Sequence, residues 1–291
     1  IEIMTKRLCR QIGFGKPLLF WGFSLAFGLS RRTSMCSALS SHILSLLYNQ
    51  YYFIFAILPI LLFFCGSVME DDPIIFVLRY GSYKHYFTSK WRSLGVLCSG
   101  LWLGQITILF VTGAGLSVIK QGWDNFSGSS LLKEIAPLLV KSFPGAWVAV
   151  FCAAVYMLMG YWLIALLTLW LGHFLQRQKA IKVLLALYIL TILSIKLPIM
   201  SRPPFCYLTG INHWVLLLHN LTAGWRFPLT VIVTLLFVVT VICSIQGGWR
   251  SAAHHHRISK GLPAYYRHIL FSASNFLVLA ILLALLVGWV W

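Results

Sequence analysis

The sequence predicts an all-α polytopic membrane protein, and three observations lead to that fold class. Of its 291 residues, 59% are hydrophobic and only 10% are charged, and the mean hydropathy is +0.85, whereas soluble domains carry roughly 25% charged residues. The apolar residues gather in long uncharged runs close to the ~20 residues that a helix needs to cross a bilayer. The formal net charge of +17 is dispersed between these runs, which is typical of contact with anionic membrane lipids and not of nucleic-acid binding.

The apolar runs predict six core spans and a seventh apolar segment near the C-terminus. The run 17–30 follows a basic leader and holds only fourteen residues, so an interfacial helix is the alternative there. Residues 33–50 are expected to form an external loop and the start of the next span. Residues 1–245 form the predicted transmembrane domain, and 246–291 a basic inner loop with a C-terminal helix. The predicted spans are 17–30, 51–68, 93–119, 143–175, 183–200, 228–245 and 269–291.

The distribution of basic residues predicts that the N-terminus lies inside the cell. With that orientation fifteen Lys and Arg residues fall in inner segments and seven in outer segments, as the positive-inside rule requires. The inner segments are 1–16, 69–92, 176–182 and 247–267. The chain is therefore expected to be a multi-pass protein of the cell membrane.

The inner segment 69–92, MEDDPIIFVLRYGSYKHYFTSKWR, has the pattern of a short capped helix between two spans. Glu70, Asp71 and Asp72 are half of the six acidic residues of the chain. Asp72 suits the N-cap, Pro73 suits the first helical position, and Gly81 suits the left-handed residue that ends a helix. A helix with acids at its start and bases at its end is typical of a docking element.

This stretch also resembles a known family. The run D-D-P-x-x-x-x-L-R-Y-G-S-x-K, residues 71–84, resembles the loop between the second and third spans of permease subunits of ABC-2 type ABC transporters. The subgroup that it resembles most handles bacteriocins, lantibiotics and other peptides. The resemblance implies that this loop is the coupling helix, which rests in a groove of a separate ATPase subunit. The implied coupling residues are Glu70, Asp71, Asp72, Pro73, Arg79, Tyr80, Ser82 and Lys84.

The resemblance implies the partners as well. They are an ABC ATPase subunit that binds ATP and Mg²⁺, a second permease subunit that is identical or different, membrane lipids and a peptide substrate. The resemblance also implies the cytoplasmic membrane of a bacterium. Segment 201–227 resembles the outer re-entrant element of the family, whereas the segment 269–291 departs from its six-span core. This chain is expected to hold no cofactor and no metal, and to be a non-catalytic subunit, since it lacks the P-loop pattern G-x-x-x-x-G-K-[ST].

Small residues recur at every fourth position in two of the predicted spans. Gly100 and Gly104 form a G-x-x-x-G pattern, and Gly145, Ala149 and Ala153 continue the same spacing later in the chain. Such stripes let helices approach closely. They predict either a subunit interface or packing within the chain, and the sequence leaves both open.

Other candidate sites have simpler interpretations. His254, His255 and His256 are adjacent, so their side chains diverge on a helix and indicate a solvated basic loop. A disulfide between Cys36 and Cys206 stays open, since these are the cysteines expected to face outward. The predicted spans contain no acid, which argues against an intramembrane enzyme. The alternatives kept are a non-transporting immunity or sensor protein that binds a peptide and, with less support, an intramembrane enzyme.

Overall fold

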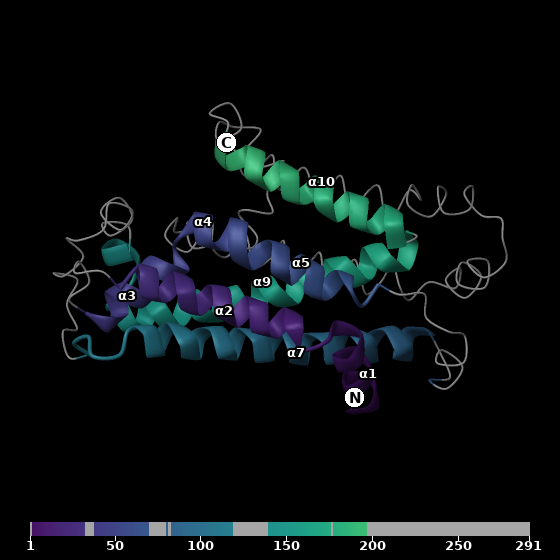
Figure 1. Cartoon of the computed structure of the whole chain (residues 1–291), viewed down its shortest axis with the longest axis horizontal. Helices are drawn as coiled ribbons and strands as arrows, with labels where there is room; N and C mark the ends of the chain where they lie inside the picture. The colour runs from purple at the N-terminus through teal and green to yellow at the C-terminus, as the bar shows by residue number, and fades with distance from the viewer. Residues whose placement is uncertain are drawn as a thin grey trace.

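The computed structural model describes residues 2–32, 38–69, 80, 83–118, 139–175 and 177–196. This part of the chain is helical and contains no strand, apart from one isolated bridge between Ala38 and Ser117 (Figure 1). The elements are α1 (Glu2–Ile12), α2 (Gly15–Ser30), α3 (Leu39–Leu47), α4 (Gln50–Tyr52), a π-helical turn η1 (Phe53–Ile57), α5 (Leu58–Gly66), α7 (Tyr83–Thr112), α9 (Ala146–Phe174) and α10 (Arg177–Lys196).

Two of these helices are long and apolar enough to cross a membrane. They are the 28 residues His85–Thr112 of α7 and the 27 residues Ala146–Gly172 of α9, and α1 with α2 adds a third if the bent pair is one span. The predicted helical class is confirmed for the described residues, and these helices are consistent with a membrane protein. Six or seven spans stay a prediction, because 201–227, 228–245 and 269–291 lie outside the described residues.

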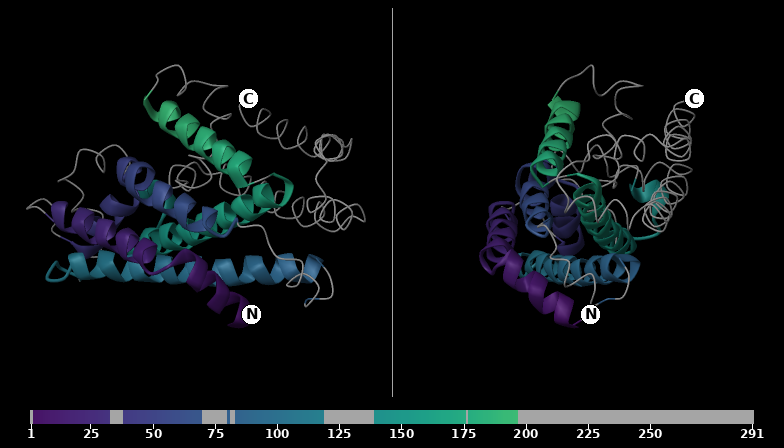
Figure 2. Two further views of the ribbon diagram at one scale, coloured as in Figure 1. Left: turned by 45° about the vertical axis from the view of Figure 1, so that its right-hand side comes forward. Right: turned by 90° about the vertical axis from the view of Figure 1, so that its right-hand side faces the viewer.

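The core of the bundle is centred on α9. In the most apolar 18-residue window of each helix, 61% of the α9 residues are buried, against 33% in α7. Helix α9 packs against α3, α5 and α7, whereas α7 lies at one side of the bundle and α10 at the opposite side (Figure 2). Large apolar residues exposed on the outer faces, such as Leu103 and Phe151, suit contact with lipid tails.

Helices α2 and α7 run side by side in the same direction. The indole N–H of Trp21 donates to the carbonyl of Leu101 at 3.2 Å. Further along both helices, Gly28 lies so close to Thr112 that a Cβ on the glycine would be 2.7 Å from the threonine hydroxyl. The order of these contacts along both helices fixes the parallel direction.

The helices that follow alternate in direction. Trp102 donates from its indole N–H to the carbonyl of Ala154 at 2.8 Å, and Trp162 donates to the hydroxyl of Ser99 at 3.0 Å. Later residues of α9 therefore meet earlier residues of α7, so these two helices are antiparallel. The segment from α4 to α5 is antiparallel to α7 as well, because Tyr52 bonds to Gln105 whereas Phe64 lies near Leu97.

The structure differs from the external loop expected before the second predicted span. Eight of the nine residues of α3 are buried, including Ser40, Ser41 and His42. The Ser41 hydroxyl donates to the carbonyl of Ala38 at 2.7 Å, and the Ser45 hydroxyl donates to that of His42 at 2.7 Å. Serines that satisfy their hydroxyls on their own helix can be buried, so a Ser-rich segment forms a core helix here.

One end of the bundle gathers most of the segments predicted to lie inside. Arg7 of α1 donates to the Tyr86 hydroxyl at the start of α7 at 3.3 Å. Met69, which follows α5, packs near Gly172 at the end of α9 and against Ala180 in α10. We call this the α1 end of the bundle, and it lies toward the right of Figure 1.

Candidate functional site

A chain of hydrogen-bonded polar side chains links four helices in the middle of the bundle. The Tyr161 hydroxyl of α9 donates to Oε1 of Gln105 in α7 at 2.5 Å, and Nε2 of Gln105 donates to the Tyr52 hydroxyl of α4 at 3.0 Å. Tyr52 donates to the Ser24 hydroxyl of α2 at 2.7 Å, and Ser24 donates to the carbonyl of Phe20 at 2.9 Å. The hydrogen bonds all run in one direction, from Tyr161 to the carbonyl of Phe20, so each of the three hydroxyl groups in this hydrogen-bonded chain donates its proton to an acceptor.

This polar chain is enclosed on all sides. Ser24, Gln105 and Tyr161 are fully buried and Tyr52 almost so. Phe27 stacks on the Tyr52 ring with centroids 4.3 Å apart, and Phe20 packs edge-on against Tyr161 at 6.1 Å. In such a low-dielectric setting an unpaired polar group is costly, so the chain fixes the relative placement of its four helices. It contains no charged group, and it therefore has the chemistry of a positioning network.

None of these four residues belongs to a motif or stripe that the sequence predicts as a site. A signal was present, because Gln105 is the only side chain with an amide in the uncharged run 93–119. A strongly polar side chain at membrane depth is expensive unless it has partners, so this residue predicts a buried network. Its partners Ser24, Tyr52 and Tyr161 carry no such signal, since hydroxyl side chains are common in spans.

The structure separates the two glycines of the predicted G-x-x-x-G pattern. A Cβ at Gly104 would overlap the indole of Trp21, so α2 and α7 approach closely at this point. At Gly100, one turn earlier, a Cβ would meet no atom within 4 Å. Gly104 thus lies in a contact within the chain, and Gly100 faces open space.

The second predicted stripe lies at the start of α9. Gly145 is the N-cap residue of α9 and has an extended backbone, with φ −164° and ψ 156°. Ala149 and Ala153 are buried in the core cluster of the bundle. Gly95, which lies outside both predicted stripes, is also in close contact, because a Cβ there would be 3.0 Å from the Trp162 ring.

Most of the predicted coupling residues lie outside the described residues. These are Glu70, Asp71, Asp72, Pro73, Arg79 and Ser82. Tyr80 is half-buried and meets the ring of Tyr86 edge-on at 5.6 Å. Lys84 belongs to the first turn of α7. The outer segment 201–227, Cys36, Cys206 and the histidines 254–256 also lie outside the described ranges.

His42 is a buried base at the far end of the bundle from α1. Its Nε2 lies 3.3 Å from the Thr112 hydroxyl, which itself donates to the carbonyl of Leu109 at 3.0 Å. With the Thr112 proton directed to Leu109, Nε2 donates to the hydroxyl oxygen and carries the ring proton of neutral His42. Nδ1 is buried and has no hydrogen-bond partner in the part of the chain that the structure describes. Burial, and then the positive charge of Arg32, lower the pKa of His42 below its ordinary value of 6.5.

We expect acid to destabilise the bundle through His42. Because the folded-state pKa is depressed, the unfolded chain binds more protons below pH 6.5, and stability falls as the pH falls, by at most about 1.4 kcal/mol per pH unit. Thermal unfolding of purified protein at pH 7.5 and at pH 5 measures this loss. His42→Gln should reduce this loss. An unchanged pH dependence in His42→Gln would contradict the assignment.

Comparison of the chain with protein-family models, with curated protein sequences and with solved structures gave no match. Within the described ranges no group of three or more His, Cys, Asp or Glu side chains could hold a metal ion.

Proposed function

We propose that this chain is the membrane-spanning permease subunit of an ABC transporter that moves a peptide or another amphipathic substrate. A separate ATPase subunit binds ATP and Mg²⁺, and a second permease subunit completes the transporter. The run of residues 71–84, with its capped acidic start and its L-R-Y-G-S-x-K end, supports this function by its resemblance to the coupling loop of ABC-2 permeases.

The observation that carries the proposal is the firm attachment of both ends of the candidate coupling segment. On one side Met69 is buried against Ala180 and Leu184 of α10, directly after α5. On the other side Tyr80 packs on Tyr86 in the first turns of α7. A push on the residues between them would reach α5, α7 and α10 together, because these helices hold both ends.

The polar chain gives the same proposal a mechanical basis. Coupling by a rigid-body shift needs helices that move as a unit, since packed interfaces switch between discrete arrangements instead of deforming continuously. Ser24, Gln105 and Tyr161 bind α2, α7 and α9 into such a unit through Tyr52. Movement at the α1 end would in this way be passed to the opposite end of the bundle.

Substitutions in the coupling segment test the proposal. Arg79→Ala removes a cation that pairs with an acid of the ATPase, and we expect binding to weaken by about 2 kcal/mol, the lower end for a desolvated charge pair. Asp72→Ala removes the helix cap and should cost about 1 kcal/mol of local helix stability. The measurement is the amount of co-purified ATPase, recognised by its P-loop sequence, after mild solubilisation of native membranes, together with transport.

Arg177→Ala is the matched control, because Arg177 is an exposed arginine at the α1 end, outside the coupling segment. It should leave co-purification unchanged, and all three variants should be produced at wild-type yield since none alters a span. A double variant of Asp72 and Arg79 that retains its ATPase and transports normally would refute the docking role. A wild-type chain that brings down no P-loop protein would favour a non-transporting immunity or sensor protein.

A further inference from the structure

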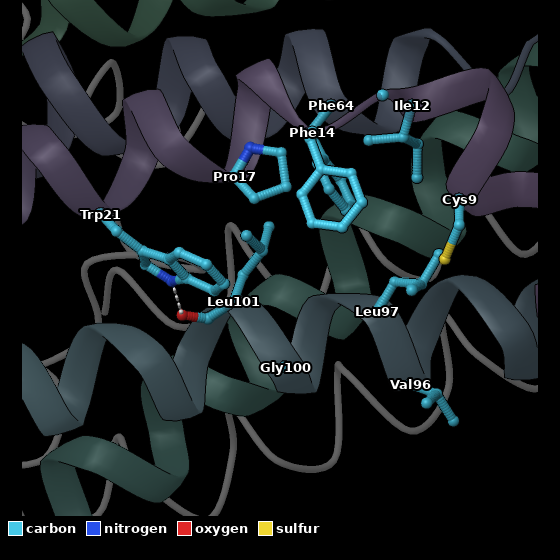
Figure 3. Close-up of a pocket in the computed structure, with 11 residues that line it drawn as sticks. Cys9, Ile12, Phe14, Pro17, Trp21, Phe64, Val96, Leu97, Gly100 and Leu101 are labelled. Carbon is cyan, nitrogen blue, oxygen red and sulfur yellow. Dashed lines mark hydrogen bonds between the residues drawn. The ribbon is translucent and has the colours of Figure 1, made fainter.

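An apolar pocket of about 220 Å³ lies at the elbow between α1 and α2 (Figure 3). Cys9, Phe14 and Pro17 line it from the elbow, and Phe64 of α5 and Leu97 of α7 line it as well. Trp21 closes one end, where its indole bonds to Leu101. One water-sized group occupies roughly 30 Å³, so the pocket has room for a run of methylene groups and not for a folded peptide.

The backbone at the elbow sets the shape of the pocket. Gly13 has φ +72°, a left-handed conformation that other residues rarely adopt, and α1 is bent by 72° from α2 at this point. The Lys16 ammonium donates to the carbonyl of Ile12 at 2.6 Å across the bend. Gly100 forms part of the floor, and the absence of any atom within 4 Å of its Cβ position reflects the open volume above it.

Helix α1 has the composition of a helix that lies on a membrane surface. Met4, Leu8 and Ile12 are buried on one face, and Lys6 and Arg10 are exposed. If α2 crosses the bilayer, a bend of 72° places α1 close to the membrane plane, where basic amphipathic helices bind anionic lipid. The pocket then opens at the level where lipid headgroups meet their acyl chains.

The charges around the pocket are positive. Lys16 sits at the rim, bonded to a lining residue and 4.9 Å from the centroid of the Phe63 ring, and Arg10 follows the lining residue Cys9. Among the described residues the only carboxylate side chain is that of Glu2, and it pairs with Lys6 at 2.7 Å. An ammonium has three donors, so Lys16 keeps two for a ligand beyond its bond to Ile12.

We propose that this elbow pocket binds an anionic glycerophospholipid, with part of one acyl chain inside the pocket and the phosphate held by Arg10 and Lys16. The pocket lining has no charged side chain and suits an acyl chain. Lys16 at the rim and the exposed Arg10, which follows the lining residue Cys9, suit an anionic headgroup. The acyl chain would contact α1, α2, α5 and α7 at once, so the bound lipid would hold the elbow at its angle. This site is independent of the transport function proposed above, since it requires only a membrane with anionic lipid.

Native mass spectrometry of the purified full chain in detergent tests the pocket. The probes are dioleoyl phosphatidylglycerol, which is anionic, and dioleoyl phosphatidylcholine, which is zwitterionic. Wild type should retain the anionic lipid with at least about tenfold higher affinity, because each Lys or Arg near anionic lipid contributes roughly fivefold in affinity and two such residues are involved. Equal retention of the two lipids would overturn the proposal.

Gly100→Leu fills the pocket from its floor without a clash. It should weaken retention of the anionic lipid about tenfold, because the lipid loses about fourfold in affinity for each methylene group that is kept out of the pocket. Gly22→Leu is the matched control. Gly22 is exposed on α2, its Cβ position also meets no atom within 4 Å, and it does not line the pocket. Wild-type retention by Gly100→Leu would overturn the acyl-chain site.

The headgroup contacts are tested separately, with exposed or rim residues whose loss leaves the fold intact. Arg10→Gln with Lys16→Gln should reduce retention of phosphatidylglycerol to the level of phosphatidylcholine, and Lys182→Gln on α10 should not. Glycerol phosphate added in excess should not displace the lipid, because the acyl chain contributes most of the binding. Displacement by glycerol phosphate would show a simple phosphate site and overturn the proposal.

Discussion

Tyr161→Ala is expected to destabilise the folded bundle by about 3 kcal/mol, the lower end for truncation of a fully buried aromatic residue. The Tyr161 side chain is fully buried and meets the rings of Phe20 and Phe53 at 6.1 and 6.4 Å. Its loss leaves a cavity in the centre of the bundle and removes the donor to Gln105. Unfolding in mixed detergent micelles, followed by circular dichroism, measures the change.

Two comparisons separate packing from hydrogen bonding at Tyr161. Tyr161→Phe removes only the hydroxyl and should cost about 0.6 kcal/mol, the average for a hydrogen bond between membrane helices. Combined with Gln105→Leu in a double-mutant cycle, it gives the coupling between the two side chains. Phe151→Ala truncates an aromatic residue on the same helix that is 69% exposed, and it should change stability by less than about 0.5 kcal/mol. Equal losses for Phe151→Ala and Tyr161→Ala would contradict the buried position of Tyr161.

Apolar runs predicted the positions of the long helices, and for α9 both ends within three residues, but the runs begin later than α7 and α10 do. The run 93–119 lies largely in α7, which starts ten residues before that run, at Tyr83, where the end of the capped segment at Gly81 also predicted that a new helix opens. Lys90 is 6% exposed and its ammonium lies 5.8 Å from the centroid of the Tyr86 ring. A lysine can bury its stem in this way, so a helix can extend beyond the uncharged stretch that crosses the hydrocarbon.

Helix α10 also extends beyond its uncharged apolar stretch. The predicted span began at residue 183, but the helix begins at Arg177 and buries Ala180 against Met69. An apolar run therefore predicts the apolar part of a helix, and it does not predict the residue at which the helix begins.

Relations between distant segments could not be predicted from the sequence. The polar chain joins Ser24, Tyr52, Gln105 and Tyr161, which meet only when four helices take one particular set of rotations about their axes. The pocket depends on one left-handed glycine, Gly13, and on the packing of the bent α1 against α7. The motif at residues 71–84, by contrast, is local and visible in the sequence, and its docking role stays a prediction.

Gly104→Leu should destabilise the bundle by about 3 kcal/mol, at the upper end of the usual cost of inserting bulk into a packed site. Even a Cβ at this position would overlap the indole of Trp21. That indole would have to move, and the bond from its N–H to the Leu101 carbonyl would be broken. The loss should appear in the same detergent unfolding measurement and in a lower thermal midpoint.

Gly100→Leu is the matched control for this change, one turn away on the same helix. Its Cβ meets no atom within 4 Å, and leucine has a higher helix propensity than glycine by up to about 0.8 kcal/mol, so stability should stay equal or rise. Opposite results at the two glycines follow if Gly104 packs within the chain. If both glycines instead formed a subunit interface, a side chain added at either position would hold the facing helix away. Both substitutions would then weaken the interface, and cross-linking in membranes would show a loss of dimer for each.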